Sequence, residues 1–147
     1  MPDKTTLKQA GRAKSEGKAP STQAGEFVRE EMEHIREGKH GARSTKQAIA
    51  IGLSKARRAG VKLPPPKAGS VSKETRRKAE LDTKKGASRT GTNPKRSRAT
   101  TKALKREGHA AASHRALSRQ GHAAAGRRTK AERSASGKKA ARTRAGG

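Results

Sequence analysis

Three clusters of cationic side chains are the residues of this chain best suited to chemistry: Lys95, Arg96 and Arg98; Arg127 and Arg128; and Lys138 and Lys139. Such side chains neutralise phosphates and release condensed counterions, which requires charge density and no fixed fold. The whole chain contains 38 Lys and Arg against 12 Asp and Glu in 147 residues, a formal net charge of +26. We therefore expect a polyanionic partner.

The aromatic content of the chain indicates which class of polyanion it binds. Phe27 is the single Phe, Trp or Tyr, and it falls on an apolar helix stripe, so we expect it in a core. Modules for single strands and RNA stack bases on exposed aromatic rings. We therefore favour double-stranded DNA, bound with little sequence preference. Structured RNA, as in a ribosome-associated protein, stays open as an alternative, whereas a membrane surface fits poorly because the basic segments lack a large apolar face.

Other chemistries find little support. Cysteine is absent, which excludes disulfides, thiolate catalysis and Cys-ligated metals. We predict no metal site, because an expected helix end separates His34 from His40, while His109, His114 and His122 lie in a Gly-interrupted segment without a carboxylate partner. Neither a phosphate-binding Walker A pattern nor a nucleophile elbow is present. We expect no enzymatic activity and no cofactor.

Large apolar residues are scarce among the elements that must position these cations. Leu, Ile, Val and Phe together number 13 of 147 residues, and highly charged chains with less than roughly 20% of these residues tend to be disordered. The fold class expected is mostly α with extensive disorder. We predict a short two-helix hairpin, followed by basic low-complexity arms that contain only nascent helices.

The first helix of the hairpin is indicated by Val28, Met32 and Ile35 at helical spacing. The hydroxyl of Ser21 or Thr22, after Pro20, is expected to cap its first turn, and Gly38 is expected to end it. The second helix starts at Ser44, where Gln47 completes a capping-box pattern, and it ends at Gly60 ahead of three prolines.

Around the hairpin we expect four segments. They are a basic N-terminal arm (1–21), the hairpin itself (22–63), a Pro-containing basic linker with one solvent-exposed helix from Ser72 to about Lys85 (64–101), and a basic Ala/Arg/Lys-rich tail (102–147). Residues 86–101 are expected to be flexible. The tail contains a 13-residue repeat, ALKREGHAAASHR at 103–115 and ALSRQGHAAAGRR at 116–128, with nine identical positions. We expect its glycines to interrupt the nascent helices.

The side chains expected to contact nucleic acid share a positive charge and a place on the second helix or beyond it. They are Arg43, Lys46, Lys55, Arg57, Arg58, Lys62, Lys95, Arg96, Arg98, Arg115, Arg119, Arg127, Arg128, Lys138 and Lys139.

Two other interpretations of the hairpin stay open. It resembles a reduced helix-turn-helix, with Lys46 and Gln47 as base readers, although no third helix is evident. Alternatively it is an adaptor that docks a protein partner, because Ile51 points away from the stripe of Ile49 and Leu53 and would be exposed on a lone hairpin. A homodimer through the hairpin stays open as well, because the few large apolar side chains of a lone hairpin leave it marginally stable.

Residues 25–66, GEFVREEMEHIREGKHGARSTKQAIAIGLSKARRAGVKLPPP, resemble an uncharacterised family of small, very basic bacterial proteins described as a domain of unknown function. The basic tail is loosely similar as well. The resemblance implies a bacterial origin and a DNA-binding function. It implies no catalytic residue. Separately, the composition of the tail is similar to that of linker-histone-like bacterial proteins, and from the charge of the chain we expect a histone-like role at the nucleoid in the cytoplasm.

Overall fold

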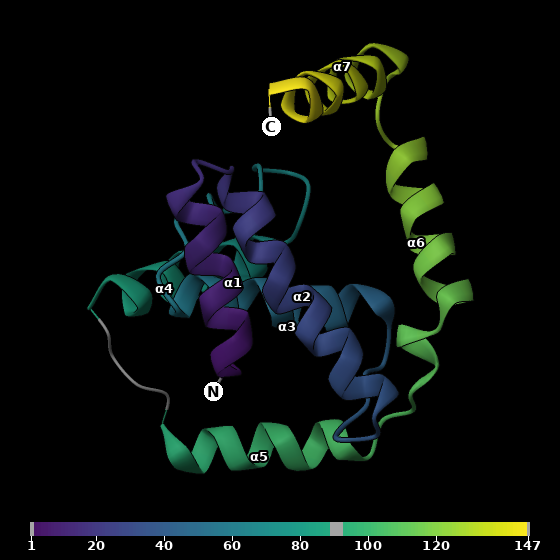
Figure 1. Ribbon diagram of the computed structural model, residues 1–147. Helices are drawn as coiled ribbons and strands as arrows, with labels where there is room; N and C mark the ends of the chain where they lie inside the picture. The colour runs from purple at the N-terminus through teal and green to yellow at the C-terminus, as the bar shows by residue number, and fades with distance from the viewer. Residues whose placement is uncertain (1, 89–92, 147) are drawn as a thin grey trace. The chain divides into compact units, whose positions relative to one another are not determined.

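The structure is a computed structural model that describes residues 2–88 and 93–146, which fold into seven α-helices and one 3-10 helix (Figure 1). The elements are α1 (Lys4–Ser15), α2 (Pro20–Arg36), α3 (Thr45–Arg58), α4 (Lys73–Ser88), α5 (Pro94–Lys105), η1 (Ala110–Ala112), α6 (His114–Gly126) and α7 (Lys130–Gly146). Within these ranges there is no β-strand, only an isolated bridge between Ala68 and Val71. Among the described residues, none of the helices combines the length with the hydrophobic composition that a membrane span needs.

The expectation of extensive disorder and low-complexity arms is wrong. Helices occupy the segment before residue 22 as well as most of the described chain beyond residue 72. The prediction counted only the larger apolar side chains, yet ten of the 14 buried hydrophobic residues are alanines. Alanine favours the helix and lets two helices approach closely, so small side chains build much of the core here.

The core of the first unit joins α1, α2 and α3. The chain divides after Ser113 into two units, of which the first holds α1 to α5 with η1 and the second holds α6 and α7. α2 packs on both α1 and α3, and the residues that meet between them are Ala10, Ala24, Phe27, Ala56 and Val61, with Leu53 and Leu63 against them. The two helices expected in the hairpin are therefore present, and α1 adds a third.

The helix ends explain how the sequence sets these boundaries. Ser44 Oγ accepts a hydrogen bond of 3.1 Å from Gln47 N, which confirms the predicted cap, while Gln47 Oε1 reaches back to Arg43 N at 2.7 Å. α2 instead begins at Pro20 without a side-chain cap, so the predicted hydroxyl cap is wrong. Proline suits the first helical position because its fixed φ is helical and it lacks an N–H.

The prediction that the helix after Ser72 is fully solvated is also wrong, because α4 packs against α3. Asp82 is buried and accepts hydrogen bonds from Arg58 Nε at 2.8 Å and from Ser54 Oγ at 2.5 Å. Ala79 and Gly86 are the other buried residues of α4. The prediction assumed that only an apolar stripe could hold this helix against a core. Instead, the buried contact of Asp82 and two small residues hold α4 against α3.

The segment expected to be a flexible linker contains α5 from Pro94 onward; residues 89–92 lie outside the described residues. Asn93 caps this helix, its Oδ1 accepting hydrogen bonds from Lys95 N at 3.0 Å and Arg96 N at 3.4 Å.

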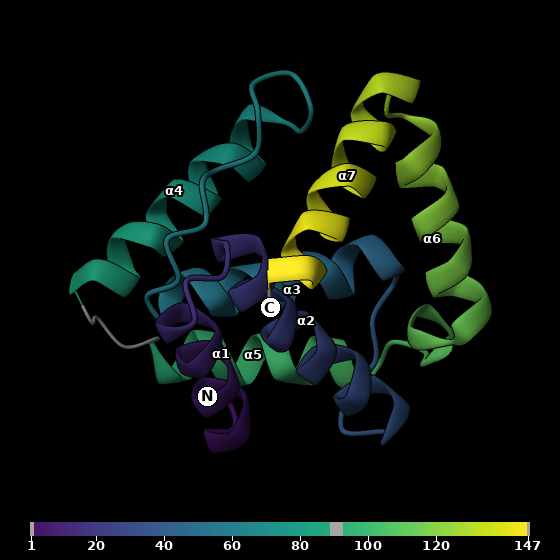
Figure 2. The ribbon, with the colours of Figure 1, turned by 45° about the horizontal axis from the view of Figure 1, so that its top comes forward.

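In the second unit, α6 and α7 follow each other through residues 127–129 (Figure 2). Gly121 and Gly137 lie inside these helices and do not interrupt them.

Candidate functional site

The basic residues of α5 form a stripe along one face. Lys95, Arg98, Lys102 and Lys105 recur at helical spacing, so they project from the same side of the helix. All four are exposed, and α5 contains no acidic residue.

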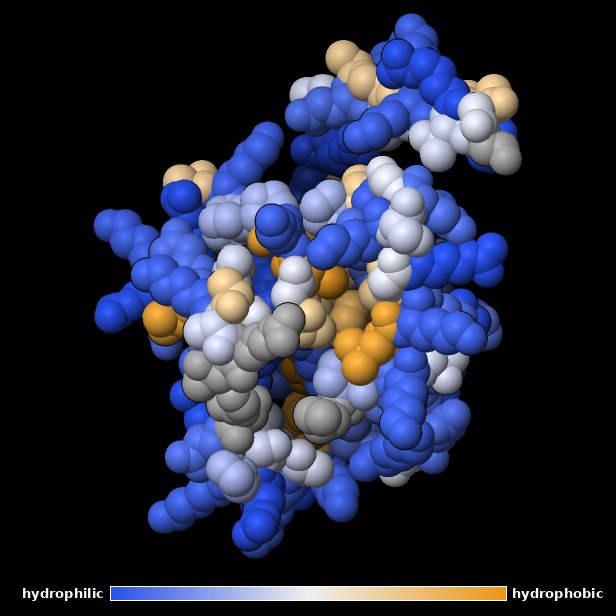
Figure 3. Space-filling view, turned by 60° about the vertical axis from the view of Figure 1, so that its left-hand side comes forward, coloured by the Kyte–Doolittle hydropathy of each residue, from blue (hydrophilic) through white to orange (hydrophobic). Residues whose placement is uncertain are grey.

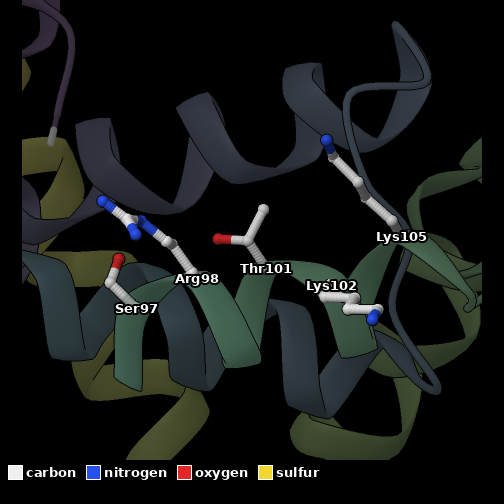
Figure 4. A pocket seen from close by; sticks show the side chains of 5 residues that line it. All are labelled: Ser97, Arg98, Thr101, Lys102 and Lys105. Carbon is white, nitrogen blue, oxygen red and sulfur yellow. The ribbon is translucent and has the colours of Figure 1, made fainter. Parts of the chain in front are cut away.

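A shallow hollow follows this face and is lined by three cations and two hydroxyls: Arg98, Lys102, Lys105, Ser97 and Thr101. In Figure 4, Arg98 and Lys105 extend toward the same side, with Thr101 between them. No carboxylate lines the hollow. Ammonium, guanidinium and hydroxyl groups are the side chains that hydrogen-bond phosphate oxygens, so the hollow suits a phosphate of a polyanion.

The C-terminal end of α5 is fixed to the loop between α2 and α3. Gly41 N donates to Leu104 O at 2.9 Å, and Ala42 N donates to Gly108 O at 3.0 Å. The two backbones approach so closely that a Cβ on Gly41 would lie 2.0 Å from Glu107 O. The C-terminal end of α5, and with it the basic stripe, is therefore attached to the α2–α3 loop of the same unit.

The second unit presents cations around its last helix, α7. α7 has six of them, at positions 130, 133, 138, 139, 142 and 144, which are spread around the helix, and it contains no buried residue. From residue 93 to residue 146 there are sixteen Lys and Arg and two carboxylates, those of Glu107 and Glu132. Two carboxylates can neutralise only a small part of this charge. Hydrophilic residues also dominate the face shown in Figure 3.

Twelve of the fifteen predicted binding residues are exposed, distributed over the α2–α3 loop, α3 and its exit, α5, α6, and α7 with the residues before it. The other three have partners inside the first unit. Lys55 bonds Glu31, Arg58 bonds Asp82, and the buried Arg57 donates to Pro64 O at 3.0 Å. Burial lowers the pKa of the Arg57 guanidinium from its ordinary value. These three side chains already act as structural contacts of α3.

A second cluster, formed by Glu31, His34 and His40, was missed from the sequence. The prediction against a metal site assumed that the end of α2 separates the two histidines. Instead, the turn at Gly38 returns the chain, and the two imidazole centroids lie 6.2 Å apart. Donor atoms of Glu31, His34 and His40 all lie within 4.8 Å of one another. The sequence did contain a signal for this cluster. Glu31 and His34 have a Glu-x-x-His spacing within one helix, and His40 follows just past the glycine that ends this helix.

Residues 13–67 match a family of unknown function, DUF6496. The match confirms that the segment resembles a family of unknown function. The matched segment contains α2, α3 and the whole Glu31, His34 and His40 cluster, whereas α5, α6 and α7 lie beyond it. No curated protein and no solved structure matches the chain.

Proposed function

We propose that the protein is a non-enzymatic, histone-like DNA-binding protein of the bacterial nucleoid. In this proposal, α5, α6 and α7 follow the phosphates of double-stranded DNA with little sequence preference. The observation that carries the proposal is the excess of sixteen cations over two carboxylates in residues 93–146, on helices whose basic side chains are exposed. Cations on all sides of α7 suit contact with a backbone rather than with base edges.

The position of Phe27 favours double strands over single strands. Its side chain is 1% exposed in the core between α1, α2 and α3, so it is unavailable for stacking on a base. RNA modules that read unpaired bases use such stacking, whereas duplex phosphates require only cations. The adaptor alternative loses its motivation, because Ile51 is half-buried and not exposed.

The test is a salt titration of the full chain on random double-stranded DNA and on a structured RNA of equal phosphate number. Contact with about 6 to 10 phosphates predicts that affinity falls roughly 10³-fold to 10⁵-fold between 50 and 200 mM salt. A flat salt profile on DNA would overturn the proposal. Clearly tighter binding to the RNA would instead favour the structured-RNA alternative.

A matched pair of quadruple variants locates the interface. The first replaces Lys138, Lys139, Arg142 and Arg144 of α7 by Gln, and the second replaces the exposed Lys4, Lys8, Lys14 and Lys84 by Gln, so both lose the same charge. The α7 variant should lower the slope of log affinity against log salt by up to about 0.9 per lost contact, and the control should change it little. Equal losses would mean that net charge alone binds DNA and would remove the role of α7.

A further inference from the structure

We propose that Glu31, His34 and His40 bind a divalent transition-metal ion, and that Zn²⁺ is the ion that fits best. Two imidazole nitrogens and one carboxylate are ligands that zinc accepts, and three protein ligands leave a fourth position for water. Donor atoms of the three residues lie within 4.8 Å of one another. The site lies in the first unit and does not depend on DNA binding by α5 to α7.

The chain brings the three side chains together by local rules. Glu31 and His34 are three residues apart in α2 and therefore share a face. Gly38 then adopts a left-handed φ of 78°, and Lys39 N donates to His34 O at 3.0 Å, which folds the chain back over the last turn. His40 follows this turn, and its Nε2 lies 3.1 Å from Glu31 Oε2.

The outer nitrogens of both imidazoles have partners that can only accept hydrogen bonds. His40 Nδ1 lies 2.9 Å from Gly41 O, while His34 Nε2 lies 3.5 Å from Asp3 Oδ2 and 3.7 Å from Glu30 Oε1. These partners place a proton on each outer nitrogen. In the neutral tautomer, the inner nitrogens, His40 Nε2 and His34 Nδ1, then direct their lone pairs toward Glu31. Metal-binding histidines show this arrangement, with the outer N–H donated to a carboxylate or a backbone carbonyl.

Glu31 supplies an independent indication. Its side chain is fully buried, and Oε1 accepts a hydrogen bond from Lys55 Nζ. Oε2 accepts no hydrogen bond of acceptable geometry from the described residues, although it faces His40 Nε2. A buried carboxylate oxygen that faces an imidazole lone pair is electrostatically unfavourable, and a cation between the two would remove the repulsion. A metal ion at this point would satisfy Oε2 and both inner nitrogens together, whereas a second proton on His40 would leave His34 Nδ1 without a partner.

Zinc and cobalt titrations of the full chain test the site. We expect one ion per wild-type chain, and a visible Co²⁺ absorption spectrum that reports imidazole ligation. His34→Gln and His40→Gln should each weaken Zn²⁺ binding by more than about 100-fold, since loss of an outer partner alone costs about 10-fold to 100-fold. The controls are His114→Gln and His122→Gln, which remove exposed histidines of the second unit and should change affinity less than about twofold.

A third variant, Lys55→Gln, keeps all three ligands and removes the cation bonded to Glu31, so it should bind Zn²⁺ more tightly than the wild type. Circular dichroism verifies that each variant is folded, and Lys55→Gln decides the test if a histidine variant does not fold. The proposal is overturned if wild-type chain binds no Zn²⁺, if the control histidine variants lose as much affinity as His34→Gln and His40→Gln, or if Lys55→Gln weakens binding. DNA affinity measured in parallel separates a failure of this site from a failure of the DNA-binding proposal.

Discussion

At the scale of single residues, small side chains decide how closely the helices pack. Gly52 of α3 faces α2 so closely that a Cβ placed there would lie 2.6 Å from Val28 Cα and 2.9 Å from Val28 N. These are backbone atoms, which cannot rotate away as a flexible side chain would. The pairing of α2 with α3, and with it the position of Glu31 beside Lys55, depends on the missing side chain at residue 52.

Gly52→Ala should therefore destabilise the fold by about 1 to 3 kcal/mol, because the two helices must separate to admit one methyl group. The matched control is Gly25→Ala in α2, where an added Cβ meets nothing within 4 Å. That control should stabilise the chain by about 0.5 to 1 kcal/mol, since alanine is the better helix former. Urea unfolding followed by circular dichroism measures both. Equal midpoints for Gly52→Ala and wild type would contradict the close packing.

His34 and His40 show which part of the metal-ligand cluster could be predicted from residue types alone. Sequence reasoning correctly placed Gly38 at the end of α2, but it treated that end as a separator between His34 and His40. A left-handed glycine after a helix reverses the chain, and here the residue two positions later contacts the helix again. The identity of the turn was therefore predictable, while the proximity of the two rings depends on three-dimensional geometry that the spacing did not specify.

At the scale of elements, α4 is held by a polar contact. Asp82 is 3% exposed and binds both Arg58 and Ser54 of α3. Asp82→Asn should destabilise the chain by about 1.5 to 3 kcal/mol, the usual contribution of hydrogen bonds to a charged group. Glu80→Gln serves as the control, because Glu80 forms an exposed pair with Arg76 and should change stability by less than about 1 kcal/mol. Thermal unfolding compares them, and similar effects would show that Asp82 does not hold α4.

The 13-residue repeat shows that neighbours can override local sequence. Gly-His-Ala-Ala-Ala at residues 108–112, in the first copy, ends in a short 3-10 turn at Ala110–Ala112, whereas the same pentapeptide at residues 121–125, in the second copy, is part of α6. In the first copy Thr45 Oγ1 donates to Ala111 O at 2.7 Å, and Arg36 Nε donates to Ala112 O at 2.8 Å. Side chains from α2 and α3 thus bind carbonyls that a continuing helix would use itself. The identical pentapeptides alone could not predict the difference.

At the scale of the whole molecule, apolar periodicity predicted α2 and α3 and gave no sign of α1. Val28, Met32 and Ile35 at helical spacing were sufficient for α2, and the Ser44 and Gln47 cap was sufficient for the start of α3. α1 contributes Ala10 and Ala13 to the core, side chains too small to mark an apolar face among its lysines. The predicted DNA-binding residues follow from charge, which the sequence reports directly, and they stay a prediction until binding is measured.

The two units should respond differently to heat. α7 has no buried residue, and in α6 only Ala116 is buried, so little apolar area supports these helices. α6 has 13 residues and α7 has 17, which is near the length of about 12 to 15 residues below which isolated helices are marginal in water, and repulsion between their cations weakens both helices further. On heating, we expect α6 and α7 to lose their helicity in a broad transition. This transition should occur at lower temperatures than the cooperative unfolding of α1 to α4.

Adding double-stranded DNA should raise the temperature of that first phase and leave the second nearly unchanged, because phosphates neutralise the cations of α6 and α7 while the core of α1, α2 and α3 is already formed. Circular dichroism at 222 nm, with the DNA signal subtracted, follows both phases, and high salt should remove the effect of DNA. The quadruple Gln variant of α7 should lose the DNA-induced shift while the equally charged control variant retains it. A single cooperative transition, unchanged by DNA, would contradict both the independence of the second unit and its role in binding.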